Sequence, residues 1–217
     1  MTGWPAALLW AVAGLGAGVL ARWGSVRLAR LEGLEPGFER WQVQGPPVLA
    51  ILLFGILGYR LGFTPALFIR SLWAGVLVQV IFFDLEHRLI LNRVLLPAAL
   101  AAIALSFVTP GLGWKLSLVA GAGAGLAFAI LALTGALVFR TEAMGMGDVK
   151  LAAFIGLILG LYPDVATARA LILGVVLAGI AAVALLVTRV RRAREGFAYG
   201  PFLAAGTLIV LLQFGAK

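Results

Sequence analysis

The sequence predicts an all-α polytopic membrane protein, a bundle of about eight transmembrane helices with the N-terminus outside. Of its 217 residues, 63% are hydrophobic and only 12% are charged, whereas soluble domains have about 25% charged residues. Apolar runs long enough to cross a hydrocarbon core of about 30 Å recur along the whole chain. No segment is polar enough for a separate soluble domain, so residues 1–217 are expected to form a single integral membrane domain.

The apolar runs predict spans at about residues 5–21, 46–61, 64–83, 90–108, 115–139, 148–162, 167–188 and 198–214. Only a short segment containing Gly62 and Pro65 separates the second run from the third, and it favours a turn. The alternative is one kinked segment there, and six or seven spans in all. The small-residue pairs Gly121/Gly125 and Gly156/Gly160 have the spacing that lets membrane helices approach closely.

The sixth run is too short for an ordinary span. At 1.5 Å per residue it reaches roughly 22 Å, less than the thickness of the hydrocarbon core. Either the bilayer thins at this point, or the segment Gly145 to Asp148 enters the membrane as irregular backbone that lines a wet cavity.

The distribution of basic residues predicts the orientation. The first run has no basic residue before it and several after it, the reverse of a cleavable signal peptide, so it is expected to stay as a span. Cytoplasmic loops carry an excess of Lys and Arg. With the N-terminus outside, the first cytoplasmic loop is expected to be short, at about 22–45. The cytoplasmic loops together then contain Arg22, Arg27, Arg30, Arg40, Arg88, Arg93, Arg140, Lys150, Arg189, Arg191, Arg192 and Arg194. The outside keeps Arg60, Arg70, Lys115, Arg169 and Lys217.

Composition also excludes several functions. The net charge of +8 comes from these loop positions, so it indicates membrane orientation and no nucleic-acid partner. The chain has no cysteine and a single histidine, His87, which excludes disulfides and a zinc site built by such ligands. No metal or other cofactor is therefore expected.

Two aspartates are the candidate catalytic residues. The chain has only nine acidic residues, and an ionisable side chain at membrane depth, which costs at least about 2.5–3.5 kcal/mol, usually marks a functional site. Asp84 ends the third predicted span and Asp148 begins the sixth, so both are expected at the cytoplasmic face. Two neighbouring carboxyl groups, one ionised and one protonated, can hydrolyse a peptide bond.

Structural roles are the alternative for the same residues. Asp148 could cap the sixth helix, and Asp84 could pair with Arg88 one turn further on. In the catalytic interpretation, Gly145 and Gly147 let a substrate backbone approach Asp148 and adopt φ values closed to other residues. Glu86 is expected at the interface, directed away from Asp84 on the helix.

Three motifs resemble those of the type IV prepilin peptidases, which are intramembrane aspartyl proteases of the GxGD type. The stretch from Gly145 to Ala153 is similar to their GxGD signature, and the stretch from Asp84 to Asn92 is similar to their first aspartate signature. Gly200 and Pro201, before Phe202, resemble the element that opens their last span. The resemblance runs from about residue 46 to the end of the chain.

The resemblance implies a function. Family members remove the short basic leader from type IV prepilins and from the pseudopilins of type II secretion, at the cytoplasmic face of the inner membrane. Asp84 and Asp148 would be the catalytic pair, and Gly145, Gly147, Gly200 and Pro201 would shape the substrate site. Many members also methylate the new N-terminal amine, using a large cysteine-containing zinc loop. This sequence resembles a short form without that loop, so methyltransferase activity is not expected.

Two other functions remain as alternatives from the sequence. Presenilin-type GxGD proteases pair their motif with Tyr-Asp and Pro-Ala-Leu elements, whereas Phe83 precedes Asp84 here and no Pro-Ala-Leu follows Asp148. A small proton-coupled transporter could also use two aspartates, but such folds place their sites near the bilayer midplane.

Overall fold

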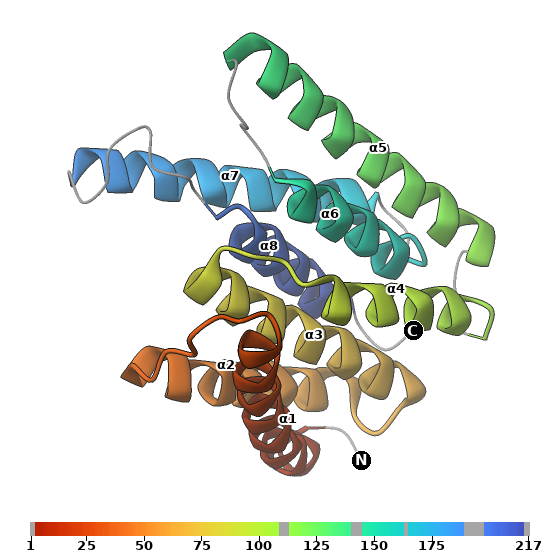
Figure 1. The fold of residues 1–217 in the computed structure, drawn as a ribbon. Coiled ribbons are helices and arrows are strands. Elements are labelled where there is room, and N and C mark those ends of the chain that lie inside the picture. Colours follow the sequence, from red (N-terminus) through yellow and green to blue (C-terminus); the bar gives the residue numbers. More distant parts are fainter. Residues whose placement is uncertain (1–2, 109–112, 140–144, 163–164, 189–197, 215–217) are drawn as a thin grey trace. The chain divides into compact units, whose positions relative to one another are not determined.

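The structure, a computed structural model, describes residues 3–108, 113–139, 145–162, 165–188 and 198–214 (Figure 1). In this part of the chain every regular element is a helix, and the helices follow in the predicted order. They are α1 (Trp4–Leu31), α2 (Arg40–Leu61), α3 (Pro65–His87), α4 (Asn92–Ser106), α5 (Trp114–Phe139), α6 (Met146–Leu159), α7 (Ala166–Val187) and α8 (Gly200–Gln213). The prediction of an all-α polytopic membrane protein is confirmed.

Five of these helices, α1, α2, α3, α5 and α7, are long and apolar enough to cross a membrane. The other three are shorter, and α6 has only 14 residues. The second and third predicted spans are separate helices: α2 ends at Leu61, and Gly62 then adopts a φ of 59°, a conformation that favours glycine.

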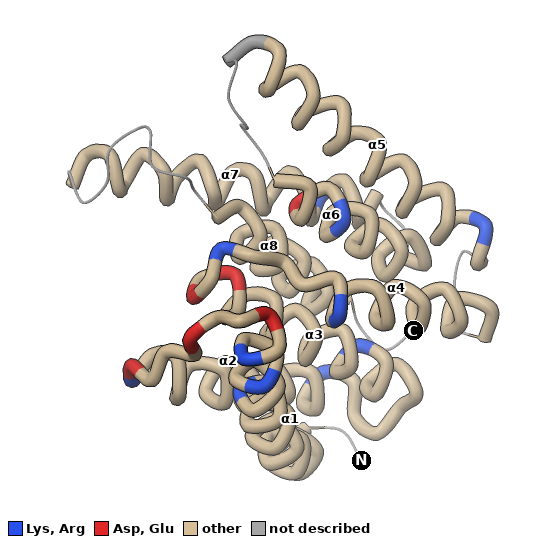
Figure 2. The backbone as a smooth tube through the Cα atoms, viewed as in Figure 1, with Lys and Arg blue, Asp and Glu red and all other residues tan. Residues whose placement is uncertain are grey.

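The first connection is shorter than predicted. A loop was expected at about 22–45, but α1 continues to Leu31 and α2 already begins at Arg40. The boundary was wrong because hydropathy marks where an apolar run ends, whereas a helix continues until its backbone is interrupted. The interruption here is Gly33, with a φ of 71°. Many charged residues of α1 to α3 lie on this connection and on the adjoining helix ends (Figure 2).

Contacts within the chain divide it into two units, residues 1–87 with 211–217, and residues 88–210. In the first unit, α1 packs closely on α2, where a Cβ at Gly14 or Gly18 would overlap the backbone of Ala50 or Pro47. Trp10 Nε1 donates a 2.7 Å hydrogen bond to Ser71 Oγ and so links α1 to α3.

In the second unit, α6 packs against α5 along the predicted small-residue faces. A Cβ at Gly156 would overlap the carbonyl oxygen of Ala120, and one at Gly125 would lie 3.0 Å from the Cβ of Ala153. Ser117 Oγ donates a hydrogen bond of 2.5 Å to the carbonyl oxygen of Leu157 across the same contact. The expected close packing is therefore confirmed, and it fixes the helix that carries Asp148.

Candidate active site

Asp84 lies in the last turn of α3 and is almost fully buried, with 4% of its surface exposed. Its neighbour Phe83 is buried too, so apolar packing stabilises the helical turn that carries the Asp84 carboxylate. The helix ends at His87, and Arg88 then adopts a left-handed conformation with a φ of 53°. Asp84 is thus a carboxylate at the end of a long, apolar helix, where the sequence placed it.

Asp148 lies in the first turn of α6 and is 8% exposed. Gly145, in extended conformation, occupies the N-cap position, so the interpretation of Asp148 as the capping residue is wrong. The peptide N–H of Asp148 donates to the carbonyl oxygen of Gly145 at 3.1 Å. A carboxylate in the first turn interacts favourably with the helix macrodipole, which helps this short apolar helix to carry a buried acid.

Irregular backbone from Gly145 to Asp148 was one of the two options for the short sixth span. The structure contradicts it beyond Gly145, because α6 already begins at Met146. The conformational argument for the glycines is also wrong. Gly145 has a φ of −74° and a ψ of 151°, which any residue can adopt, and Gly147 is not among the glycines with positive φ.

Space explains the two glycines better than conformation. A Cβ at Gly147 would lie 3.1 Å from the Cβ of Ile90, tighter than ordinary van der Waals contact, whereas a Cβ at Gly145 would meet no atom of the described residues closer than 3.9 Å. Gly147 therefore permits close packing inside the protein, and a Cβ at Gly145 would lie 4.0 Å from Oδ2 of Asp148, in ordinary contact with that carboxylate.

The GxGD segment packs against residues that belong to the first aspartate signature. Ile90 covers Gly147, and Lys150 Nζ donates a 3.0 Å hydrogen bond to Oδ1 of Asn92, the first residue of α4. Lys150 was expected to act only as an orientation anchor. Its hydrogen bond shows a second role, since it joins the start of the second turn of α6 to the first turn of α4.

Gly200 and Pro201 are the first two residues of α8, and both are buried. Proline suits the first turn of a helix because its missing N–H would have no partner there. The two residues thus open the last helix, as the sequence predicted.

Among the residues that the structure describes, no group of three or more His, Asp or Glu side chains is arranged to hold a metal ion. Glu86 accepts bonds from Arg22 and from the backbone N–H of Gly37, and its Oε1 lies 3.4 Å from Nε2 of His87. These contacts could not be predicted from the sequence, because Arg22 and Gly37 are distant from Glu86 in the chain and no local pattern pairs them with it.

Comparison with known proteins agrees with the motifs. The type IV leader peptidase family matches residues 71–188, a range that contains both Asp84 and Asp148. The chain belongs to this family, and it is a multi-pass membrane protein. The comparisons favour neither the presenilin-type alternative nor the transporter.

Two relatives carry the name prepilin leader peptidase/N-methyltransferase. The protein of Bacillus subtilis is 30% identical over 160 residues, which cover 74% of this chain and 61% of the relative. That of Myxococcus xanthus is 35% identical over 112 residues, which cover 50% of this chain and 33% of the relative. The chain thus spans less than two thirds of either relative. No solved structure matches it significantly.

Proposed function

We propose that this protein is a membrane-embedded aspartic endopeptidase that removes the leader peptide of type IV prepilins or pseudopilins, with residues 1–217 acting as one peptidase domain. The observation that carries the proposal is the position of two buried aspartates, Asp84 and Asp148, at the ends of apolar helices within the matched range. The names of the two relatives support the same activity.

The reaction needs the two carboxyl groups in different protonation states. In a shared site of low dielectric they cannot both be ionised, so one retains its proton. The ionised carboxylate takes a proton from a water molecule as the water oxygen bonds to the scissile carbonyl carbon. The protonated carboxyl gives its proton to the carbonyl oxygen. The tetrahedral intermediate then collapses: the C–N bond breaks, the leaving amine takes a proton from the first carboxyl, and one hydroxyl of the intermediate returns its proton to the second carboxylate as the C=O bond re-forms.

The test is co-expression with a tagged pseudopilin that has an intact leader. We expect the pseudopilin to be shortened at a single position after its basic leader, as read by intact-mass spectrometry of the membrane fraction. The same pseudopilin expressed with an empty vector must stay full length. A substrate that keeps its leader in the presence of the folded protein would rule out the proposed function.

Both aspartates are proposed to face the cytoplasm, because the distribution of basic residues predicts that orientation. Reporter fusions after Arg93, Arg140 and Arg194 are expected to report a cytoplasmic position, and fusions after Lys115 and Lys217 an external one. An external reading at Arg140 would place the two aspartates on opposite sides of the bilayer, and one shared site would then be impossible.

We predict that the peptidase works without metal. The chain has no cysteine, and the segment between α1 and α2 is short, so a zinc-stabilised subdomain has no room to form there. Activity should survive chelators and thiol reagents, and the product should carry a free N-terminal amine. Addition of S-adenosylmethionine followed by mass spectrometry checks this. A stoichiometric gain of one methyl group would contradict the prediction.

The contact between α4 and α6 should contribute to catalysis by holding the turn that carries Asp148. Lys150→Met removes a hydrogen bond worth about 1 kcal/mol, so we expect cleavage to slow by roughly fivefold. Because the two groups are partners, Lys150→Met combined with Asn92→Ala should be no slower than the slower single variant. Lys115→Met, which removes a lysine that lies over Trp114 on α5, is the control. Additive losses would show that Lys150 and Asn92 act separately.

A further inference from the structure

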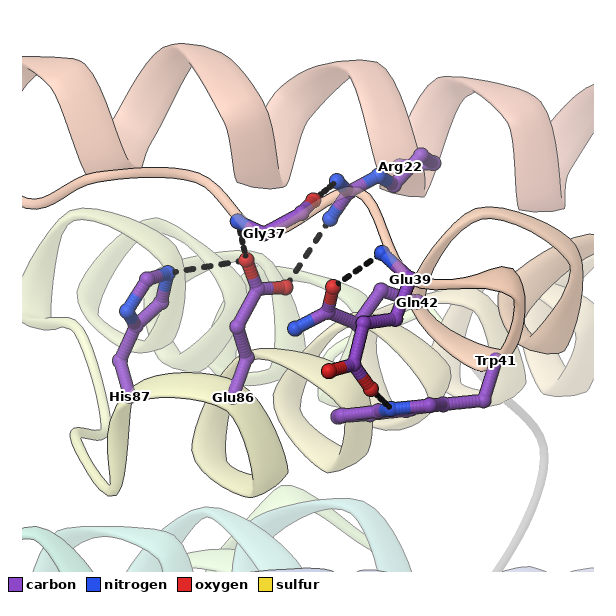
Figure 3. A network of polar contacts seen from close by, with 7 residues as sticks. All are labelled: Arg22, Gly37, Glu39, Trp41, Gln42, Glu86 and His87. Carbon is purple, nitrogen blue, oxygen red and sulfur yellow. Dashed lines mark hydrogen bonds and ion pairs between the residues drawn. The ribbon is translucent and has the colours of Figure 1, made fainter.

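A network of polar side chains fastens the connection between α1 and α2 to the last turn of α3 (Figure 3). Its centre is Glu86, two residues after Asp84. Glu86 Oε2 accepts a 2.9 Å bond from the guanidinium of Arg22 on α1. Glu86 Oε1 accepts a 2.5 Å hydrogen bond from the backbone N–H of Gly37 in the connection. The Nε2 atom of His87 lies 3.4 Å from the same oxygen.

Burial makes this arrangement more than a surface ion pair. The side chain of Glu86 is only 5% exposed and that of Arg22 only 11%. A carboxylate this far from water is tolerated only when charge and hydrogen bonds compensate for its lost hydration. Both oxygens of Glu86 have such partners, and removal of one partner would leave a buried charge uncompensated.

The connection is itself held in one conformation. The guanidinium of Arg22 also donates to the carbonyl oxygen of Gly37, so this one peptide segment is bound at both its N–H and its C=O. A Cβ at Gly37 would overlap the side-chain amide of Gln42 on α2. Gln42 in turn accepts a 2.8 Å hydrogen bond from the backbone N–H of Glu39, where α2 begins. The connection and the three helices α1, α2 and α3 therefore meet at Gly37 and Glu86.

The position of the network matters because Asp84 lies in a helix end. The last carbonyl groups of a helix have no partner within it, so the final turn frays unless other contacts hold it. Here the final turn is also followed by Arg88 in a left-handed conformation, which a residue other than glycine adopts only when its surroundings enforce it. Glu86 is the residue of this turn that binds both α1 and the connection.

We propose that Glu86 is a positioning residue: through Arg22 and Gly37 it fixes the last turn of α3 and thereby the direction of the Asp84 carboxylate. The proposal rests on the proposed function for its consequence in catalysis. A catalytic group displaced by about 1 Å can cost on the order of 100-fold in rate. Loss of the network should therefore lower kcat, while KM for the leader-bearing substrate stays within about twofold.

Two measurements test the proposal on the protein of residues 1–217 in detergent. The first does not depend on the reaction. The connection contains Glu32, Glu35 and Glu39, and all three are exposed, so a glutamate-specific protease reports whether it is held in place. We expect the wild type to resist cleavage there, and Glu86→Ala and Arg22→Ala to be cut at least tenfold faster. Equal resistance of the wild type and both variants would overturn the proposal.

The second measurement is the kinetics of leader removal. We expect kcat to fall at least tenfold in Glu86→Ala and less in Gly37→Ala, which displaces the connection without changing a charge. Glu86→Gln keeps an acceptor for the Gly37 N–H, so it should fold and show an intermediate kcat. Ser71→Ala is the matched control, because it removes the α1–α3 hydrogen bond from Trp10 far from Asp84; it should leave kcat unchanged.

The outcomes separate this proposal from the proposed function. A connection that is cut faster in Glu86→Ala while kcat stays at the wild-type value would show that the network only stabilises the fold, and would refute positioning. An equal fall of kcat in Ser71→Ala would refute it too. If the wild type cleaves no pseudopilin, the proposed function fails, and with it the catalytic consequence, whereas the protease result still decides whether Glu86 fixes the connection.

Discussion

Replacement of Asp84 or Asp148 by asparagine should abolish leader removal, with a loss on the order of 10⁴-fold in kcat. Asparagine has nearly the same volume as aspartate, so it preserves packing at these buried positions, but it can neither take a proton from water nor give one to the carbonyl oxygen. Co-expression of each variant with a leader-bearing pseudopilin, read by intact mass, measures the loss. The amount of folded variant in the membrane should equal that of the wild type.

The double variant distinguishes a shared site from two independent roles. Residues of one catalytic unit are strongly non-additive, so Asp84→Asn combined with Asp148→Asn should be no slower than either single variant. Glu35→Gln, at an exposed position in the connection, is the control and should keep wild-type activity. Near-normal turnover by Asp148→Asn would end the aspartyl-protease hypothesis.

The second large effect is expected at Gly156, where α6 packs on α5. A Cβ there would overlap the carbonyl oxygen of Ala120 and approach the Cα of Gly121. Both are backbone atoms, so a side chain can fit only if the helices move apart. Overpacking of this kind typically costs about 1–3 kcal/mol or more. Gly156→Val should therefore lower the yield of folded protein and reduce its melting temperature in detergent.

The matched control is Gly123→Val on α5. Gly123 is exposed, and a Cβ there meets no atom of the described residues within 4 Å, although the substitution of valine for glycine is chemically the same. We expect this variant to fold like the wild type. Equal loss of stability in both variants would show that valine harms these helices through conformational preference, and that close packing of α5 on α6 is not what Gly156 provides.

The sequence was sufficient to predict the order of the helices, because each apolar run is bounded by glycine, proline or charge. It could not predict where helices end outside the apolar runs. α1 continues for ten residues beyond the predicted end at residue 21, up to Leu31, since the polar residues there still form a helix. Helix α6, by contrast, was expected to be short, and it is.

Of the candidate site, the two aspartates were visible because a carboxylate is rare and costly in so apolar a chain. The packing of Gly147 could not be predicted, since only the structure shows Ile90 beside it. The network around Glu86 could not be predicted from the sequence for a similar reason. Its partners Arg22 and Gly37 lie 64 and 49 residues away in the sequence. Tertiary packing, not a local sequence pattern, determines which residues so far apart come into contact.

The central claim is that this membrane protein cuts a leader peptide with Asp84 and Asp148 and without any other catalyst. The most direct measurement is the mass of a pseudopilin after incubation with the purified protein in liposomes that contain a chelator. The account predicts one new product, shorter by the basic leader, with the wild type, and unchanged substrate with Asp84→Asn or Asp148→Asn. An uncut substrate with the wild type, or the same product with either variant, would contradict it.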